Sequence, residues 1–141
     1  MKYTELLFDK NTGNMIYPRP SIDPTIPLSE FEPRFVYDTA EIDASCISEL
    51  NTFSDFCKQH GAKFYVTYSP AYKGSVASGK TEIVGYEAWL SEKLKAPVIS
   101  TIERNLLPKE CVYNGALHMN DKGAERYTTQ LYKDLCNCNA F

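Results

Sequence analysis

Apolar residues recur at helical spacing in three stretches of the chain, which predicts three amphipathic helices. The first covers residues 41–60, where apolar positions are three or four residues apart and Gly61 can form a left-handed cap. The second covers residues 81–95, and the third covers residues 121–136 with Asn120 as its N-cap. The buried stripe of the first helix is predicted to consist of Ile42, Cys46, Leu50, Phe53 and Cys57.

Two short apolar runs between these helices predict buried strands. Residues 63–68 are rich in β-branched and aromatic residues and are followed by Ser69 and Pro70, and residues 97–101 read PVIST. Strands that alternate with helices imply a mainly parallel sheet with helices on both faces. We therefore predict a three-layer α/β/α domain whose ligand site lies at the carboxyl ends of the strands.

The first forty residues have a different character. Apolar runs at 6–8 and 15–17 surround the turn-forming letters DKNTGN, which predicts a hairpin. Prolines recur from Arg19 to Pro33 and predict an extended surface segment. We treat residues 1–141 as one domain, in which residues 1–40 form the hairpin and the proline-rich segment and residues 41–141 form the α/β core.

Composition narrows the classes of function. The net charge is −3 and no block of lysines or arginines is present, so we expect no nucleic-acid partner. No apolar run approaches the roughly 18 residues that cross a membrane, and the sequence as written shows no export signal, which predicts a cytoplasmic protein. The five cysteines lack the paired spacing of a zinc site, so we expect free thiols and neither a metal nor another cofactor.

One motif has the pattern of a phosphate site. The letters GSVASGKT, from Gly74 to Thr81, fit the P-loop pattern G-x-x-x-x-G-K-[ST]. A P-loop joins a strand directly to a helix, whereas residues 69–73 intervene here, and no aspartate follows the second predicted strand to help hold magnesium. We favour the alternative, a mobile loop in which Thr81 caps the next helix and Lys80 is solvated.

A histidine lies two residues before the cap of the last predicted helix, within the letters VYNGALHMN. Histidine can take up a proton near neutral pH, so His118 is a candidate general base. Asn114, four residues earlier, can accept a hydrogen bond from the second ring nitrogen and fix its tautomer. The alternative is that His118 merely packs between the loop and the helix.

This segment resembles the last motif of the SGNH, or GDSL, hydrolase family, in which an acid and a histidine precede the C-terminal helix in a phrase such as D-x-x-x-H-L-N-x-x-G. The stretch AKFYVTYSP is similar to the family's strand that leads to a substrate loop. The resemblance implies a flavodoxin-like three-layer fold and an esterase, lipase or acyl transferase acting on lipid or carbohydrate esters. The residues that carry it are Asn114, His118, Met119, Asn120 and Gly123.

Two features depart from the family's pattern. Asn114 stands where the family has its acid, and the chain contains no Gly-Asp-Ser tripeptide, which carries the family's nucleophile. Ser69 is the best internal candidate for a nucleophile, with the alternative that Ser-Pro simply ends the strand. Tyr72 and Asn120 are candidate contacts for a small-molecule ester or carbohydrate substrate.

These departures leave several interpretations open. The chain is the C-terminal portion of a longer hydrolase, which could act outside the cytoplasm, or a shortened gene product, or a degenerate member without activity. A non-catalytic module that binds carbohydrate or protein on the same scaffold is the alternative function. A truncated sheet would expose an apolar edge, so we expect homo-oligomers.

Overall fold

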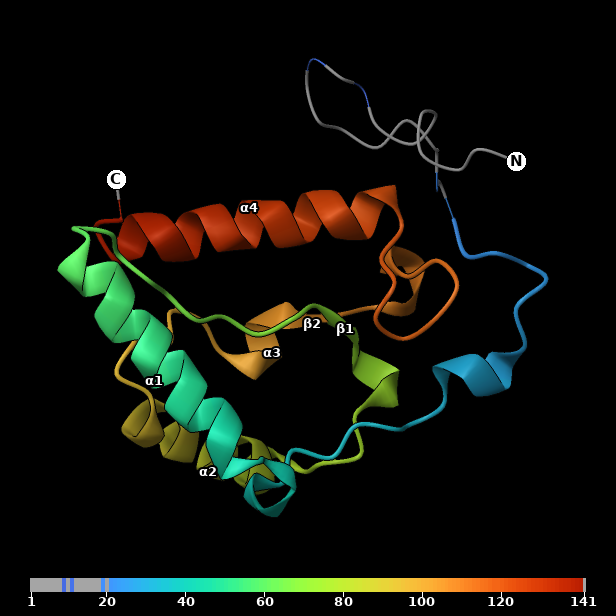
Figure 1. The fold of residues 1–141 in the computed structure, drawn as a ribbon. Coiled ribbons are helices and arrows are strands. Elements are labelled where there is room, and N and C mark those ends of the chain that lie inside the picture. The colour runs from blue at the N-terminus through green and yellow to red at the C-terminus, as the bar shows by residue number, and fades with distance from the viewer. Residues whose placement is uncertain (1–8, 10, 12–18, 20, 141) are drawn as a thin grey trace, which may run out of the picture.

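The computed structural model describes residues 9, 11, 19 and 21–140, whose regular structure consists of four α-helices, two short parallel strands and four 3₁₀-helices. The 3₁₀-helices cover Leu28–Phe31, Thr39–Glu41, Lys73–Ser75 and Lys109–Cys111, so the proline-rich segment predicted to be extended contains one helical turn. Figure 1 shows the two strands between α4 and α2. The hairpin predicted around residues 6–17 lies outside the described residues apart from two positions. The elements are α1 (Ala44–Gln59), β1 (Ala71–Tyr72), α2 (Lys80–Lys93), α3 (Ile102–Asn105), β2 (Leu106–Leu107) and α4 (Asp121–Asn137).

The predicted helices are present as α1, α2 and α4, but one predicted cap is wrong. The helix α2 begins after Gly79, whose N–H donates to the Glu82 carboxylate at 2.7 Å, so Thr81 does not cap it. The helix α4 begins after Asn120 as predicted, and the Asn120 side-chain oxygen accepts the N–H of Gly123 at 3.0 Å. Both ends thus satisfy backbone donors that a helix leaves unpaired.

The two predicted strands pair less extensively than expected. Val66 and Val98 form an isolated parallel bridge, in which the Val66 N–H donates to the carbonyl of Pro97 at 3.0 Å. Regular pairing follows further along both segments, where β1 and β2 run parallel in the register Ala71–Leu106. In the second segment, the helical turn α3 lies between Val98 and β2 and so separates the two pairings. The described residues therefore form a mixed α/β fold with a two-stranded parallel sheet.

The core consists of two apolar clusters. One cluster lies under the start of α4 and contains Phe31, Leu107, Cys111, Val112 and Met119. The other lies between α2 and the paired segments and contains Tyr68, Leu90, Leu94 and Ile102. Close approach of α4 to the first cluster requires Gly123, because a Cβ there would lie 2.1 Å from the carbonyl oxygen of Cys111.

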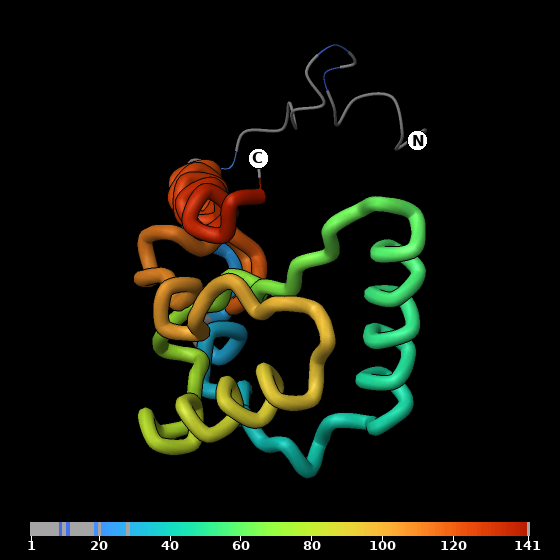
Figure 2. Tube along the Cα trace, turned by 90° about the vertical axis from the view of Figure 1, so that its left-hand side faces the viewer, coloured from blue at the N-terminus to red at the C-terminus, as the bar shows by residue number. Residues whose placement is uncertain are grey.

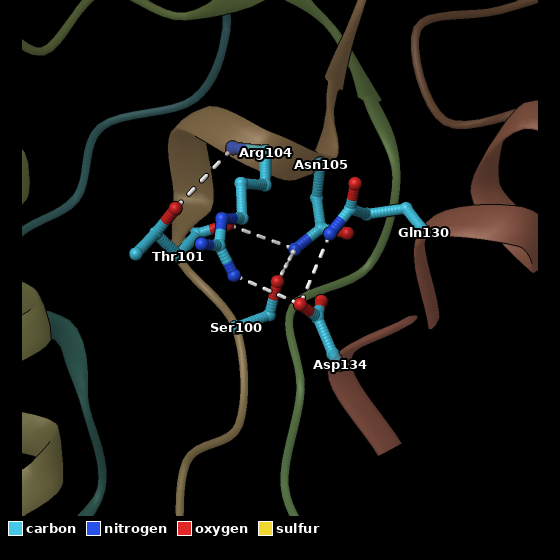
Figure 3. Close-up of polar contacts among 6 residues, drawn as sticks. All are labelled: Ser100, Thr101, Arg104, Asn105, Gln130 and Asp134. Carbon is cyan, nitrogen blue, oxygen red and sulfur yellow. Dashed lines mark hydrogen bonds and ion pairs between the residues drawn. The ribbon is translucent and has the colours of Figure 1, made fainter. Parts of the chain in front are cut away.

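A polar cluster joins α3 to α4, as Figure 3 shows. Asp134 is 1% exposed, and its Oδ1 accepts hydrogen bonds from Arg104 at 2.9 Å and from Gln130 at 3.0 Å. Asn105, also buried, donates to the Ser100 hydroxyl at 3.0 Å. Because a buried carboxylate is costly without such donors, the cluster fixes the position of α4 against α3.

The helix α1 contributes no buried side chain, so the buried stripe predicted for it is wrong. Figure 2 shows α1 standing away from the other helices. Its apolar residues Leu50, Phe53 and Phe56 are 37%, 50% and 53% exposed, and we call them the exposed α1 face. Periodicity established which face of this helix is apolar, but the described part of the chain does not cover that face.

Candidate functional site

The loop before α4 is held by its own backbone. The N–H of Tyr113 donates to the carbonyl of His118 at 2.8 Å, and the N–H of His118 donates to the carbonyl of Gly115 at 3.1 Å. Beneath the loop, the Asn120 side-chain amide donates to the carbonyl of Glu110 at 2.8 Å. These bonds, together with the start of α4, give the loop a defined shape.

Within this loop the side chains of His118 and Asn114 meet. The distance between His118 Nδ1 and Asn114 Oδ1 is 2.9 Å, which is the contact expected from the sequence. A carbonyl oxygen can only accept a hydrogen bond, so this contact assigns the proton to Nδ1 and leaves the lone pair on Nε2. Both side chains are exposed. The geometry therefore presents a basic nitrogen to solvent, and its catalytic role stays a prediction.

A cavity of about 470 Å³ borders His118. The loop forms one wall, with Asn114 and Leu117 beside His118, and a second wall comes from α4, with Tyr127 and Thr128. Small-molecule sites commonly measure about 300–1,000 Å³, so this cavity has the size of a site for a compact ligand.

Ser69 lies outside this cavity. It is exposed and lines a neighbouring cavity of about 270 Å³, and Leu117 borders both cavities. No hydrogen bond joins Ser69 to His118 in the described part of the chain. Thr128 and Tyr127 also line the His118 cavity, and the Tyr127 hydroxyl donates to the carbonyl of Tyr68 at 3.2 Å. The structure therefore brings His118 to Asn114 but not to Ser69.

The two predicted substrate contacts, Tyr72 and Asn120, do not line the His118 cavity. Tyr72 packs edge to face on Phe31 with ring centroids 6.3 Å apart, and it does not line the His118 cavity. Asn120 is 0% exposed, and both its side-chain oxygen and its side-chain nitrogen are hydrogen-bonded within the fold. In this structure neither residue offers a side-chain polar atom to the cavity beside His118.

Arg19 is a lining residue that the sequence did not indicate. Its backbone N–H donates to the Asp121 carboxylate at 2.9 Å, and the N–H of Asp121 donates to the carbonyl of Arg19 at 2.9 Å. These bonds place the Arg19 side chain in the wall of the His118 cavity. No local pattern predicts a contact between residues 102 positions apart.

The segment with the P-loop pattern is anchored by hydrogen bonds, while its residues Val76, Ser78 and Lys80 line a cavity of about 310 Å³. The Ser75 hydroxyl is buried and donates to the carbonyl of Phe31 at 2.9 Å, and the N–H of Ala77 donates to the carbonyl of Phe35 at 2.9 Å. The Glu82 carboxylate already accepts the N–H at the start of α2. Phosphate sites of this kind depend on free backbone donors, and several of those donors are already paired here.

Three tyrosines near the cavity that Ser69 lines have raised pKa values. Burial raises the pKa of Tyr68, Tyr37 and Tyr86, and the negative charge of Glu87 raises those of Tyr68 and Tyr37 further. A raised pKa keeps a phenol neutral well into the alkaline range. These hydroxyls therefore do not supply a base at neutral pH.

Comparisons with protein-family models, with curated proteins and with solved structures give no match for this chain. Within the described residues, no group of three or more histidine, cysteine, aspartate or glutamate side chains could hold a metal ion. No helix among these residues is both long and apolar enough to cross a membrane. The interpretation of the site therefore depends on its own geometry.

Proposed function

We propose that this chain carries the histidine part of an ester-hydrolysing or acyl-transferring site of SGNH type. The observation that supports the proposal is the 2.9 Å contact between His118 Nδ1 and Asn114 Oδ1, in a loop that borders a cavity and precedes α4. The parallel pairing of the two strand segments supports a three-layer α/β/α fold around a larger parallel sheet, which we propose as the architecture.

In the proposed reaction, Nε2 of His118 takes the proton from a hydroxyl as its oxygen attacks the ester carbonyl. The same proton then passes to the departing alkoxide, and water releases the acyl group in a second, equivalent step. Asn114 orients the imidazole but brings no charge to stabilise imidazolium. In serine proteases the corresponding change from aspartate to asparagine costs about ten-thousand-fold in turnover, so we expect slow catalysis.

Ser69 is our candidate nucleophile: its cavity adjoins that of His118 at Leu117, which lines both, and the proposed proton transfer requires the Ser69 hydroxyl to come within hydrogen-bonding distance of Nε2. The test is hydrolysis of p-nitrophenyl acetate near pH 7.5 by the purified chain, by Ser69→Ala and by His118→Ala. The chain has two histidines, and His60, at the end of α1, contacts the carbonyl of Phe56. His60→Ala is therefore the matched control for unspecific hydrolysis by imidazole.

We expect the wild-type chain and His60→Ala to turn over the ester, and His118→Ala to fall to the rate of buffer. Equal rates in the wild-type chain and His118→Ala would contradict the proposal. That result would favour a non-catalytic module that binds a small ester or carbohydrate in the same cavity. The observation favouring this second function is that no serine hydroxyl is hydrogen-bonded to His118 within the described residues.

The exposed α1 face supports a proposal about assembly. Folded monomers seldom leave several large apolar side chains uncovered on one helix, and such patches commonly mark interfaces. We propose that a second copy of the chain covers this face in a homo-oligomer.

A further inference from the structure

We propose that the His118 cavity binds the anionic group of its ligand through Arg19. The ligand class is a small molecule with a carboxylate or phosphate group. The inference extends the proposed function in one respect, because an ester substrate of this site would then carry such a group.

The first argument is the state of the Arg19 side chain. The side chain is 24% exposed, and its Nε atom is buried without a hydrogen-bond partner. Arg19 Nε forms an ion pair with Oδ1 of Asp121 at 3.8 Å, a distance that is too long for a hydrogen bond. A buried donor on a cationic group is costly without a hydrogen bond, and the ion pair with Asp121 does not supply one.

The second argument is the charge of the cavity wall. Among the described residues that line it, Arg19 is the permanently charged one, and none is an aspartate or glutamate. Asp121 does not line the cavity, and its Oδ2 accepts the backbone N–H of Arg19 at 2.9 Å. The guanidinium is therefore incompletely neutralised. Its planar set of donors matches the two oxygens of a carboxylate or phosphate and can bind them in bidentate fashion.

The third argument is position. Two hydrogen bonds anchor the Arg19 backbone to Asp121, the first residue of α4: the Arg19 N–H donates to the Asp121 carboxylate and the Arg19 carbonyl accepts the Asp121 N–H, each at 2.9 Å. His118 precedes the same helix and lines the same cavity of about 470 Å³. One compact molecule can therefore contact Arg19 with its anionic group while another part of it reaches His118.

The test is equilibrium binding of glutarate and of inorganic phosphate to the full chain by isothermal titration calorimetry. Glutaramide, a neutral analogue of glutarate, is the ligand control. Arg19→Gln removes the charge but retains the backbone anchors. Arg126→Gln is the matched protein control, because Arg126 is an exposed residue of α4 that does not line the His118 cavity.

We expect the wild-type chain and Arg126→Gln to bind at least one of the two anions saturably, and glutaramide not to bind. The pair of anions distinguishes a carboxylate site from a phosphate site. In Arg19→Gln the affinity should fall at least about ten-fold, the loss typical of one charge-assisted contact. Absence of anion binding in the wild-type chain, or equal affinity in Arg19→Gln, would overturn the inference.

Two further measurements complete the design. If thermal unfolding shows that Arg19→Gln is not folded, Arg19→Lys replaces it, since a lysine keeps the charge but cannot form the bidentate contact. An affinity for the anion equal to that of wild type in a folded Arg19→Lys would overturn the bidentate geometry. Binding without any ester hydrolysis leaves this inference standing and rejects the proposed catalysis, whereas hydrolysis of p-nitrophenyl acetate without anion binding does the reverse.

Discussion

The amide of Asn114 orients His118 without supplying the negative charge that a carboxylate would bring. Its Oδ1 lies 2.9 Å from Nδ1 of His118, and an aspartate at this position would place a carboxylate oxygen at a similar distance. Because a carboxylate stabilises imidazolium as it forms, Asn114→Asp should raise kcat for p-nitrophenyl acetate at least about ten-fold. Initial rates near pH 7.5 as a function of ester concentration measure this.

The matched control at this position is Asn114→Ala, which removes the hydrogen bond and should lower kcat below that of the wild-type chain. Both side chains of the pair are exposed, so neither variant disturbs the core. If Asn114→Asp were no faster than the wild-type chain while His118→Ala was inactive, the charge of the orienting residue would not limit the reaction.

The same pair shows which parts of a site a sequence can predict. Asn114 and His118 are four residues apart within one short loop, so the spacing alone made their contact foreseeable. Arg19 meets Asp121 across 102 residues, and no local pattern encodes that distance. Asn120 was foreseeable as a helix cap, but its burial depends on packing against the segment that contains Glu110.

At the scale of elements, periodicity predicted the existence of α1, α2 and α4 well and their surroundings poorly. The α2 cap differs from prediction because Glu82 reaches back to Gly79, a choice that depends on side-chain geometry rather than on residue type. The apolar residues of α1 recur at helical spacing, but this periodicity does not indicate which part of the molecule covers them, and α1 has no buried side chain. The strand prediction was wrong in extent, since residues 63–68 form one bridge through Val66.

The helix α1 is held by Asn51, by the ion pair between Asp55 and Lys95, and by Ile47, which packs against the second core cluster. The Asn51 side-chain amide donates to the carbonyl of Lys93 at 2.9 Å, and its oxygen accepts the N–H of Lys95 at 2.7 Å. Since α1 has no buried side chain, Asn51→Ala should loosen this helix locally and leave the rest of the fold intact. Hydrogen exchange read by mass spectrometry should show faster exchange over residues 44–59 and unchanged exchange over residues 121–137.

Glu49→Gln is the control for this experiment, because Glu49 is an exposed residue of α1 two positions before Asn51. It should exchange like the wild-type chain. Equal exchange in Asn51→Ala and Glu49→Gln would mean that other contacts hold α1, such as the ion pair between Asp55 and Lys95 or the ring contact between Phe53 and Phe64, whose centroids are 5.0 Å apart.

At the scale of the whole molecule, the described part of the fold has an uncovered side. The exposed α1 face continues onto the segment at residues 63–68 through the edge-to-face contact between Phe53 and Phe64. On that segment, the N–H and carbonyl groups of Tyr65 have no hydrogen-bond partner within the described residues. An apolar helix face beside an unpaired strand edge combines the two features that most favour association of chains.

We therefore expect the chain to elute as a dimer or larger oligomer at micromolar concentration when its mass is measured by light scattering after size exclusion. The double variant Phe53→Gln, Phe56→Gln should shift the population towards the monomer, because it removes the apolar area that a second copy would bury while keeping good helix formers. Val84→Gln is the control, since Val84 is 54% exposed on α2 and lies outside the exposed α1 face. A wild-type chain that is monomeric, or an oligomer that the double variant leaves unchanged, would contradict an interface built on α1.

If the monomeric double variant still bound glutarate or phosphate through Arg19, the cavity beside His118 would function within a single copy. Assembly would then serve to cover the exposed α1 face rather than to complete the site.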